Sequence, residues 1–321
     1  MVATWSNQVL NMKVKPHGIY PILYAFYDEG GILDRAAMRS QVNSCIQVGA
    51  HGIAVLGLIT EVLWLSDSER MQVIEWAVED IDNRVPLAAT VAGESVEAQI
   101  QLARHAETVG ADWLILQPPQ TWQPNELELL RFFGSIMDAT SLPVGIQNFP
   151  EVLVVGLNPS NIRTLQHQHA NFTVMKGEGP VYSIRQYIDA SEGNISIFNG
   201  RGGIELPDNL RAGCSGIIPA PDCADLQIAM YEAYIENNYS RLDQLYALSL
   251  PYVTFIMQSV DFALTYGKRL AARRMNIPGD HVPRKSLIQT DTFGLQRLEG
   301  HSEFMGSFGE WHEQDVDSGV E

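Results

Sequence analysis

The stretch NFTVMKGEGPVYSIRQYI (Asn171–Ile188) contains an apolar run, a short turn with Gly and Pro, and an amphipathic segment, in that order. The run from Phe172 to Met175 has the residue types of a buried strand. After Pro180, apolar residues return every three or four positions, which is the spacing of one helical face. The stretch therefore predicts one strand–helix unit.

The same unit recurs along the chain, because seven other β-rich runs each lead into a longer amphipathic segment. The eight runs are GIYPILY (18–24), GIAVLG (52–57), PLAATVAG (86–93), DWLILQPP (112–119), PVGIQNFP (143–150), NFTVMK (171–176), SIFNG (196–200) and CSGIIP (214–219). Strands that alternate with helices predict a parallel sheet. Eight units over this length predict an α/β fold, a closed (β/α)8 TIM barrel. A doubly wound open sheet is the alternative, but no G-x-G-x-x-G follows the first run.

The order of these patterns divides the chain into three parts. We expect a barrel domain over residues 15–237 and a helical extension over 238–282, since 240–275 has the pattern of two or three amphipathic helices. Within the barrel, Ser66 and Glu69 form a capping-box pattern at a helix start. Residues 283–321 are acidic and lack clear periodicity, so the sequence leaves open whether they are disordered or pack in an interface.

Composition limits the partners of the chain. It has 321 residues, 45% hydrophobic and 18% charged, with a formal net charge of −17. A chain with this negative charge is a poor candidate for binding nucleic acid or anionic lipid, because both partners are negatively charged. Three cysteines without a C-x-x-C pair fit a reducing cytoplasm. We expect a cytoplasmic protein, because the first residues lack a signal-peptide pattern and no stretch approaches the length of a membrane span.

In a barrel of this class, chemistry lies at the carboxyl ends of the strands. Four of the predicted ends carry notable residues: GLITE (57–61), QNFP (147–150), KGE (176–178) and NGRGG (199–203). The last could be a simple glycine turn, or its Arg201 could meet a substrate carboxylate. Farther along, Lys268, Arg269, Arg273 and Arg274 have helical spacing and are expected to form a solvated or interface face.

Lys176 carries an amino group at the end of an apolar strand. A desolvated ammonium is costly unless it is paired or loses its proton. A buried lysine that loses its proton is a nucleophile that can form a Schiff base, whereas a rim lysine can also simply reach solvent. Glu178 lies two residues on and faces the same side if the strand continues, so it could shuttle protons. Its alternatives are an ion pair with Lys176 or an acidic cap on the next helix.

Together, these motifs resemble the dihydrodipicolinate synthase/N-acetylneuraminate lyase superfamily. The resemblance runs from about Lys15 to Pro278 and rests on the strand-end motifs G-x-x-x-E, x-N-x-P and Lys-x-Glu in that order. It implies a class I, Schiff-base-forming barrel enzyme that acts on a 2-oxo acid without a cofactor. It also implies a homodimer or a homotetramer. We find no metal-ligand spacing of His, Asp and Glu, which counts against a metal-dependent aldolase.

The chain departs from the usual motifs of that superfamily at three places. Leu58 and Ile59 replace two hydroxyl residues, Gln147 replaces the proton-relay tyrosine, and Val152 replaces an arginine that holds a second carboxylate. These departures argue against a dihydrodipicolinate synthase. Gln147, Lys-Gly-Glu at 176–178 and Thr-Glu at 60–61 resemble instead the branch of the L-2-keto-3-deoxyarabonate dehydratases.

The resemblance implies a set of site residues. The catalytic candidates are Lys176, Glu178 and Gln147, and the substrate-binding candidates are Gly57, Thr60, Glu61, Asn148, Gly200, Arg201 and Ile218. Thr60 is expected to hold the substrate carboxylate. The expected reaction is the dehydration of a 2-keto-3-deoxy sugar acid. The alternatives are a pyruvate-dependent aldolase and a non-catalytic protein that binds a 2-oxo acid.

Overall fold

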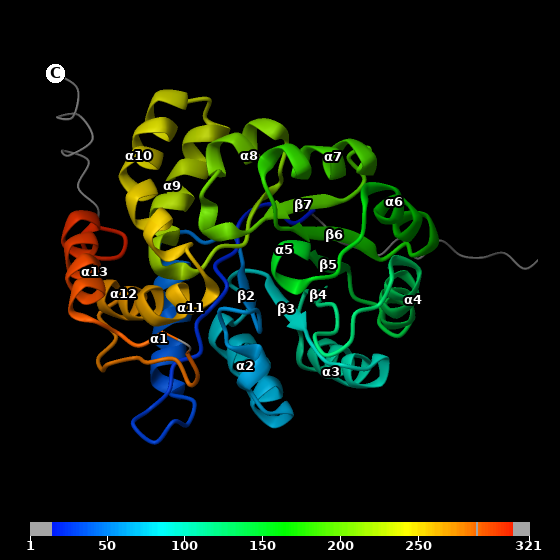
Figure 1. Ribbon diagram of the computed structural model, residues 1–321, viewed down its shortest axis with the longest axis horizontal. Helices are drawn as coiled ribbons and strands as arrows, with labels where there is room; N and C mark the ends of the chain where they lie inside the picture. Colours follow the sequence, from blue (N-terminus) through cyan, green and yellow to red (C-terminus); the bar gives the residue numbers. More distant parts are fainter. Residues whose placement is uncertain (1–14, 287, 311–321) are drawn as a thin grey trace, which may run out of the picture.

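Eight parallel strands form one sheet in the computed structural model, which describes residues 15–286 and 288–310 (Figure 1). The strand order is β1-β8-β7-β6-β5-β4-β3-β2. The strands are β1 (Gly18–Ile19), β2 (Ile53–Val55), β3 (Leu87–Val91), β4 (Trp113–Leu116), β5 (Val144–Asn148), β6 (Phe172–Gly177), β7 (Ser196–Asn199) and β8 (Gly216–Ile217). The predicted parallel sheet is confirmed.

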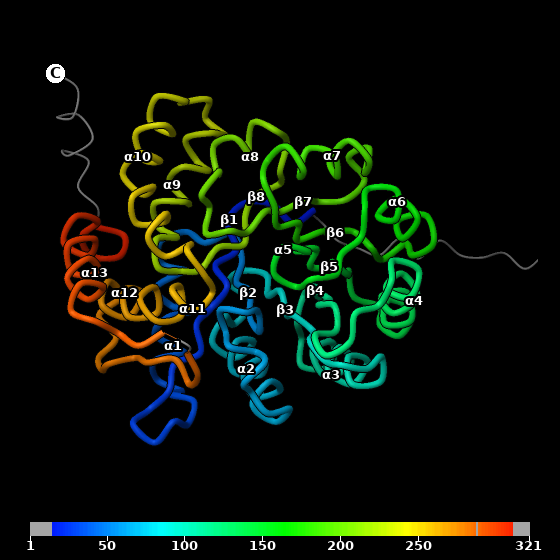
Figure 2. The backbone as a smooth tube through the Cα atoms, in the orientation of Figure 1, coloured from blue at the N-terminus to red at the C-terminus, as the bar shows by residue number. Residues whose placement is uncertain are grey.

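The sheet closes on itself between its first two strands. Beyond β1, Ile22 forms a parallel bridge with Ala54 of β2. The Leu23 amide donates to the Ala54 carbonyl at 2.9 Å, and the Ala54 amide donates to the Pro21 carbonyl at 2.9 Å. On its other side, β1 pairs with β8, as the tube in Figure 2 shows. The fold is therefore a closed (β/α)8 TIM barrel, and the doubly wound open sheet is excluded.

Helices surround the barrel and alternate with its strands. They are α1 (Arg35–Gln47), α2 (Asp67–Ile81), α3 (Val96–Val109), α4 (Glu126–Met137), α5 (Pro150–Leu153), α6 (Pro159–Gln168), α7 (Val181–Ser191), α8 (Leu206–Ala212) and α9 (Ala224–Ile235). The 3₁₀ turns η1 (Val62–Trp64), η2 (Arg201–Gly203) and η3 (Pro221–Cys223) follow β2, β7 and β8. The predicted capping box begins α2: the Ser66 hydroxyl accepts from the Glu69 amide, and the Glu69 carboxylate accepts from the Ser66 amide.

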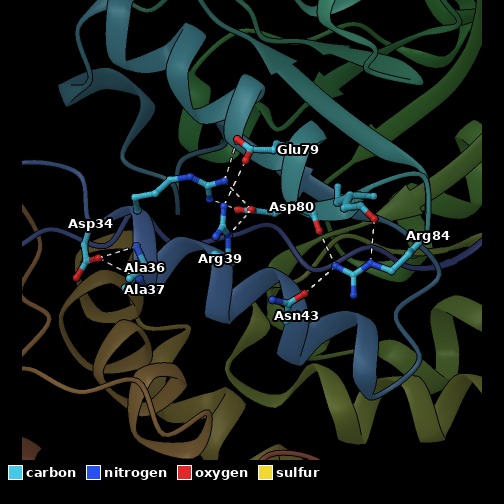
Figure 3. Close-up of polar contacts among 10 residues, drawn as sticks. Asp34, Ala36, Ala37, Arg39, Asn43, Glu79, Asp80 and Arg84 are labelled. Carbon is cyan, nitrogen blue, oxygen red and sulfur yellow. Dashed lines mark hydrogen bonds and ion pairs between the residues drawn. The ribbon is translucent and has the colours of Figure 1, made fainter.

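An ion-pair cluster joins α1 to α2 on the outside of the barrel (Figure 3). Asp80 is almost fully buried and accepts from Arg39 Nε at 2.8 Å and from Arg35 Nη2 at 2.6 Å. Arg84, after α2, donates to Asn43 of α1 at 2.7 Å. Since a buried carboxylate needs partners, the two arginines of α1 fix α2 beside it.

Further helices follow the barrel. They begin with α10 (Tyr239–Ile256) and continue through α11 (Val260–Phe262), the π-helical turn η4 (Ala263–Gly267) and α12 (Lys268–Arg274). One further helix, α13 (Thr292–Met305), lies beside α12 (Figure 1). Within the described residues, no single helix is long and apolar enough to span a membrane. One pair of helices, bent by 107° between Ile256 and Val260, passes that test by length and composition alone.

The helix α13 lies in the segment 283–321, for which the sequence left disorder and packing in an interface open. Its buried residues are Gly294, Leu298, His301 and Met305, spaced as one helical face. Only two of these four are typical apolar residues, so the face does not appear in a hydrophobicity pattern. Gly294 is needed because a Cβ there would lie 2.1 Å from the Tyr266 hydroxyl. The rest of that segment, residues 311–321, lies outside the described residues.

The inside of the barrel has an aromatic floor. Tyr20, Trp113 and Phe198 lie with ring centroids 5.6 to 6.1 Å apart. Side chains in a strand alternate between the two faces, so the residues two and four positions after Trp113 also point inward. Trp113 and Ile115 are thus followed by Gln117, and Val174 by Lys176. A polar layer follows the apolar layers at the carboxyl end of the barrel.

Candidate active site

Lys176 and Glu178 meet at the carboxyl end of β6. Lys176 Nζ lies 3.1 Å from Glu178 Oε1, and the two side chains are 7% and 8% exposed. Glu178 follows the last strand residue, but its amide still donates to the Asn148 carbonyl at 2.9 Å, as in a continued ladder. Glu178 therefore points to the same side as Lys176, as the spacing of two residues predicts.

Two amide side chains extend this pair across the neighbouring strands. Gln147 is the register partner of Lys176, and its Nε2 donates to Glu178 Oε1 at 2.6 Å. Gln117, after β4, donates from Nε2 to Gln147 Oε1 at 2.8 Å. An ionised carboxylate only accepts hydrogen bonds, so Glu178 sets the orientation of Gln147, and Gln147 sets that of Gln117. Gln117 lies in the predicted strand run 112–119 but is not among the site residues predicted from sequence. The sequence pattern that could have identified Gln117 is its spacing of two and four residues from Ile115 and Trp113, which both point into the barrel.

The other carboxylate oxygen of Glu178 faces the loop after β7. Oε2 accepts from the Arg201 amide at 3.4 Å. A Cβ at position 200 would lie 2.4 Å from this oxygen, so Gly200 makes room for the Glu178 carboxylate. Arg201 has a φ of +50°, which is uncommon for a residue other than glycine, and its guanidinium pairs with Glu205 at 3.1 Å. The loop after β7 therefore contacts the Glu178 carboxylate, so it does more than connect β7 to the next helix.

These groups border a cavity of about 260 Å³ at the mouth of the barrel. Five of the predicted site residues line it: Gln147, Lys176, Glu178, Arg201 and Ile218. Of the described residues in the lining, Lys176 and Arg201 are the cations. The remaining lining is largely aliphatic and comes from the segments after β1, β2, β5, β7 and β8 and from residues 256–263. A small anion with an electrophilic carbon could reach the Lys176 amino group here.

Three predicted substrate-binding residues are instead used inside the protein. Thr60 is fully buried, and its hydroxyl donates to the Leu23 carbonyl at 2.6 Å. Asn148 donates to the Leu157 carbonyl at 2.9 Å and accepts from the Leu157 amide at 2.8 Å, which fastens the loop after β5. At Gly57 a Cβ would meet the Ile22 side chain at 2.2 Å. The Thr60 hydroxyl, which was expected to hold the substrate carboxylate, instead bonds to the segment that follows β1.

Glu61 is likewise a structural residue. Its Oε1 accepts from Lys268 Nζ at 2.5 Å, its Oε2 accepts from the Arg284 amide at 2.7 Å, and both side chains of the ion pair are fully buried. Burial is the main cause that lowers the pKa of Lys268 to about 8, against the attraction of Glu61. Glu61 therefore links the loop after β2 to α12 and to the segment before α13.

Two of the four cations expected to form a solvated or interface face on α12 lie inside the protein. Lys268 and Arg274 are buried, and Arg274 makes a two-bond ion pair with Asp225 of α9 at 2.7 and 2.9 Å. Arg269 and Arg273 pair with the exposed Asp280 and Glu299. Half of the cationic pattern therefore faces inward. Over residues 15–286 and 288–310, no group of three or more His, Cys, Asp or Glu side chains is placed to hold a metal ion.

Comparison with known proteins gives concordant matches. The model of the Dihydrodipicolinate synthetase family matches residues 15–253. The probable 2-dehydro-3-deoxy-D-pentonate aldolase YjhH of Escherichia coli K12 is 27% identical over 258 residues, 76% of this chain and 86% of that protein. The 4-hydroxy-tetrahydrodipicolinate synthase of Methanococcus aeolicus is 30% identical over 202 residues, 63% of this chain and 69% of that protein.

Solved structures show the same fold. The crystal structure of YagE from E. coli K12, a prophage protein of the dihydrodipicolinic acid synthase family in complex with pyruvate, has a TM-score of 0.82 and 23% identity. The superposition covers 89% of this chain and 97% of the YagE chain. At this identity the likeness shows the fold alone, whereas the family match spans well over half of the sequence. The chain belongs to the Dihydrodipicolinate synthetase family.

Proposed function

We propose that the chain is a lyase in which Lys176 forms a Schiff base with C2 of a 2-oxo acid, and that it dehydrates a 2-keto-3-deoxy acid. The family to which it belongs consists of lyases and synthases, which supports enzymatic activity. The observation that carries the proposal is the distance of 3.1 Å between Lys176 Nζ and Glu178 Oε1 at the inner end of the cavity. A nucleophile and a proton acceptor face the same small volume there.

The proposed chemistry begins with attack of the neutral amine on the C2 ketone. Loss of water gives an iminium, which withdraws electrons and acidifies the C3 protons. Glu178 takes a C3 proton to give the enamine, and returns it to the C4 hydroxyl as that group leaves as water. Hydrolysis of the remaining imine frees Lys176. Glu178 can serve both steps because its Oε1 lies beside the amine and its side chain lines the cavity.

Gln147 supports dehydration over carbon–carbon cleavage. Retro-aldol cleavage needs a base that removes the proton of the C4 hydroxyl, and an amide is not such a base. The donor of Gln147 is directed at Glu178 and its acceptor at Gln117, so its part is to position the carboxylate. Cleavage remains the second candidate because the relative YjhH carries the name of an aldolase. A non-catalytic 2-oxo-acid-binding protein is the third, and the retained Lys176–Glu178 pair speaks against it.

Arg201 replaces Thr60 as the proposed anchor for the substrate carboxylate. Arg201 lines the cavity with a side chain that is 25% exposed, and its ion pair with Glu205 leaves other N–H donors for a second carboxylate. We also propose a homodimer or homotetramer, which light scattering would test.

Borohydride trapping tests the proposed Schiff base. Reduction in the presence of pyruvate should add the mass of the ligand to the peptide that contains Lys176, and to no peptide that contains Lys268. With 2-keto-3-deoxypentonate the enzyme should then release 2-oxoglutarate semialdehyde. Pyruvate with glycolaldehyde as the main products would establish the aldolase instead. Failure to trap any 2-oxo acid, or trapping on another lysine, would refute the mechanism.

A further inference from the structure

The outer part of the cavity is apolar. We call the aliphatic residues Leu58, Ile59, Val152, Ile204, Met257 and Val260 the outer wall. They come from the segments after β2, β5 and β7 and from the α10–α11 corner, so the cavity is lined by such residues from several directions. The reacting groups Gln147, Lys176 and Glu178 lie at its inner end, where the carboxyl ends of β5 and β6 meet. The outer wall therefore borders the same cavity as the reacting groups and is available to contact a substituent on C4.

Two polar side chains beside the outer wall each make a hydrogen bond within the protein. Gln258 Nε2 donates to the Phe255 carbonyl at 2.9 Å. The Ser259 hydroxyl accepts from the Phe262 amide at 3.1 Å, as the cap of α11. Glu151 is an exposed side chain at the rim. A chain with several hydroxyl groups would lose bonds to water here and find few replacements, which weakens binding.

We propose that the substrate carries an apolar substituent, a branched alkyl or aryl group, on C4. A second cavity of about 290 Å³ shares Leu58 and Val260 with the first. It adds the apolar Leu63, Trp64 and Leu264 beside the polar residues Glu61, Asp261, Lys285 and Ser286, so part of its surface could contact a larger apolar group. This inference rests on the proposed function and refines it. It replaces the sugar acid expected from sequence by an apolar 4-hydroxy-2-oxo acid.

The reaction of such a substrate balances without a further reactant. R–CH(OH)–CH2–CO–COO⁻ loses the C4–O bond and one C3–H bond and gives R–CH=CH–CO–COO⁻ and water. The C3 proton leaves with the hydroxyl through Glu178, and no electron is gained or lost. Because R carries no hydroxyl, the product keeps its double bond in place of rearranging to an aldehyde.

Two substrates of nearly equal shape test the inference. In 4-hydroxy-5-methyl-2-oxoheptanoate, methyl groups replace the C5 and C6 hydroxyls of 2-keto-3-deoxyhexonate. We expect kcat/KM, measured by mass spectrometry of substrate consumption, to favour the methyl compound by roughly 10- to 100-fold, the range for an apolar pocket. Equal values, or a preference for the hexonate, would overturn the inference.

Variants of the outer wall locate the preference. Met257→Gln nearly keeps the size of the side chain, and we expect it to reduce the ratio at least about fivefold, whereas Met257→Leu should keep it. Val260→Thr, which conserves shape, should change the ratio in the same direction. Leu127→Gln is the matched control, because Leu127 is 56% exposed on α4. Ratios in Met257→Gln and Val260→Thr that change no more than in the control would contradict an apolar subsite.

A binding measurement separates this inference from the proposed function. In Lys176→Ala, calorimetry reports the affinity for both compounds without imine formation, and the methyl compound should have the lower Kd by about tenfold or more. If trapping at Lys176 fails while this preference holds, the Schiff-base proposal is wrong and the subsite stands. If trapping succeeds and the affinities are equal, the subsite is wrong and the Schiff base stands.

Discussion

Two buried lysines in this chain each face a glutamate, in very different surroundings. Lys176 and Glu178 are 3.1 Å apart, slightly exposed, and line a cavity. Lys268 and Glu61 are 2.5 Å apart and fully buried, enclosed by the Val282 carbonyl, the Tyr27 ring and the Arg284 amide. Burial and a partner are common to both pairs. The Lys176–Glu178 pair differs in lining a cavity from which a ligand can reach the amine. Access of a ligand to the amine is therefore what indicates a catalytic lysine.

The largest expected effect follows from removing the amine that lines the cavity. Lys176→Met should lower turnover by at least roughly 10⁴-fold, since loss of a covalent nucleophile removes the whole pathway. Borohydride trapping should disappear, and the thermal unfolding midpoint shows whether the variant is folded. A folded variant that still turns over substrate would remove the distinction between the two lysines.

The second comparison is between the two carboxylates. Glu178→Gln should reduce turnover by roughly 10²–10⁴-fold, the usual contribution of a positioned general acid–base, while trapping at Lys176 persists. Glu61→Gln is the matched change in the enclosed pair, and it should lower the free energy of unfolding with a much smaller effect on turnover of the folded protein. Both are measured by steady-state kinetics and urea unfolding. Similar kinetic losses in the two variants would assign Glu61 a part in the chemistry.

The enclosed pair should matter for stability. Lys268→Met leaves the Glu61 carboxylate buried without its cation, and we expect the free energy of unfolding to fall by about 3–5 kcal/mol. The double variant Lys268→Met/Glu61→Leu should recover much of that loss, because apolar side chains of similar volume can replace a buried ion pair. Urea unfolding of the three proteins measures this. An unstable double variant would show that the pair supplies more than charge compensation.

The smallest effect concerns Glu69, whose carboxylate pairs with Arg284 at 2.7 Å beside the enclosed pair. The hydrogen bond to Arg284 is the main cause that lowers the pKa of Glu69 to about 2. A carboxyl with a lowered pKa in the folded state stabilises above its usual pKa, and this contribution is lost as pH falls toward 2. The free energy of unfolding of the wild type minus that of Glu69→Gln should therefore decline from pH 5 to pH 2. The side chains of Arg284 and Glu69 are 26% and 24% exposed, so solvent partly screens the pair and the decline should stay near or below about 1 kcal/mol.

Regular alternation made the barrel and its central pair accessible from sequence. Lys176 and Glu178 are two residues apart on a strand, so their common direction follows from strand geometry. Gln117 was missed because its role is a hydrogen bond to Gln147 on the neighbouring strand. The sequence of one strand does not show which side chain on the next strand it meets. Thr60 was misplaced because it lies in a turn between Leu56 and Glu61, both with positive φ, and such backbone sets side-chain direction independently of the strand period. Helix α13 was missed because Gly294 and His301 occupy its buried face.

The enclosed pair also has a consequence for how the protein is made. Glu61 is separated by 207 residues from Lys268 and by 223 residues from Arg284. On the ribosome, all eight strands are synthesised before either partner exists, and until then the Glu61 carboxylate must stay in water. Leu58 and Ile59, in the same loop, belong to the wall of the cavity. The substrate site can therefore reach its final shape only after nearly the whole chain has been synthesised.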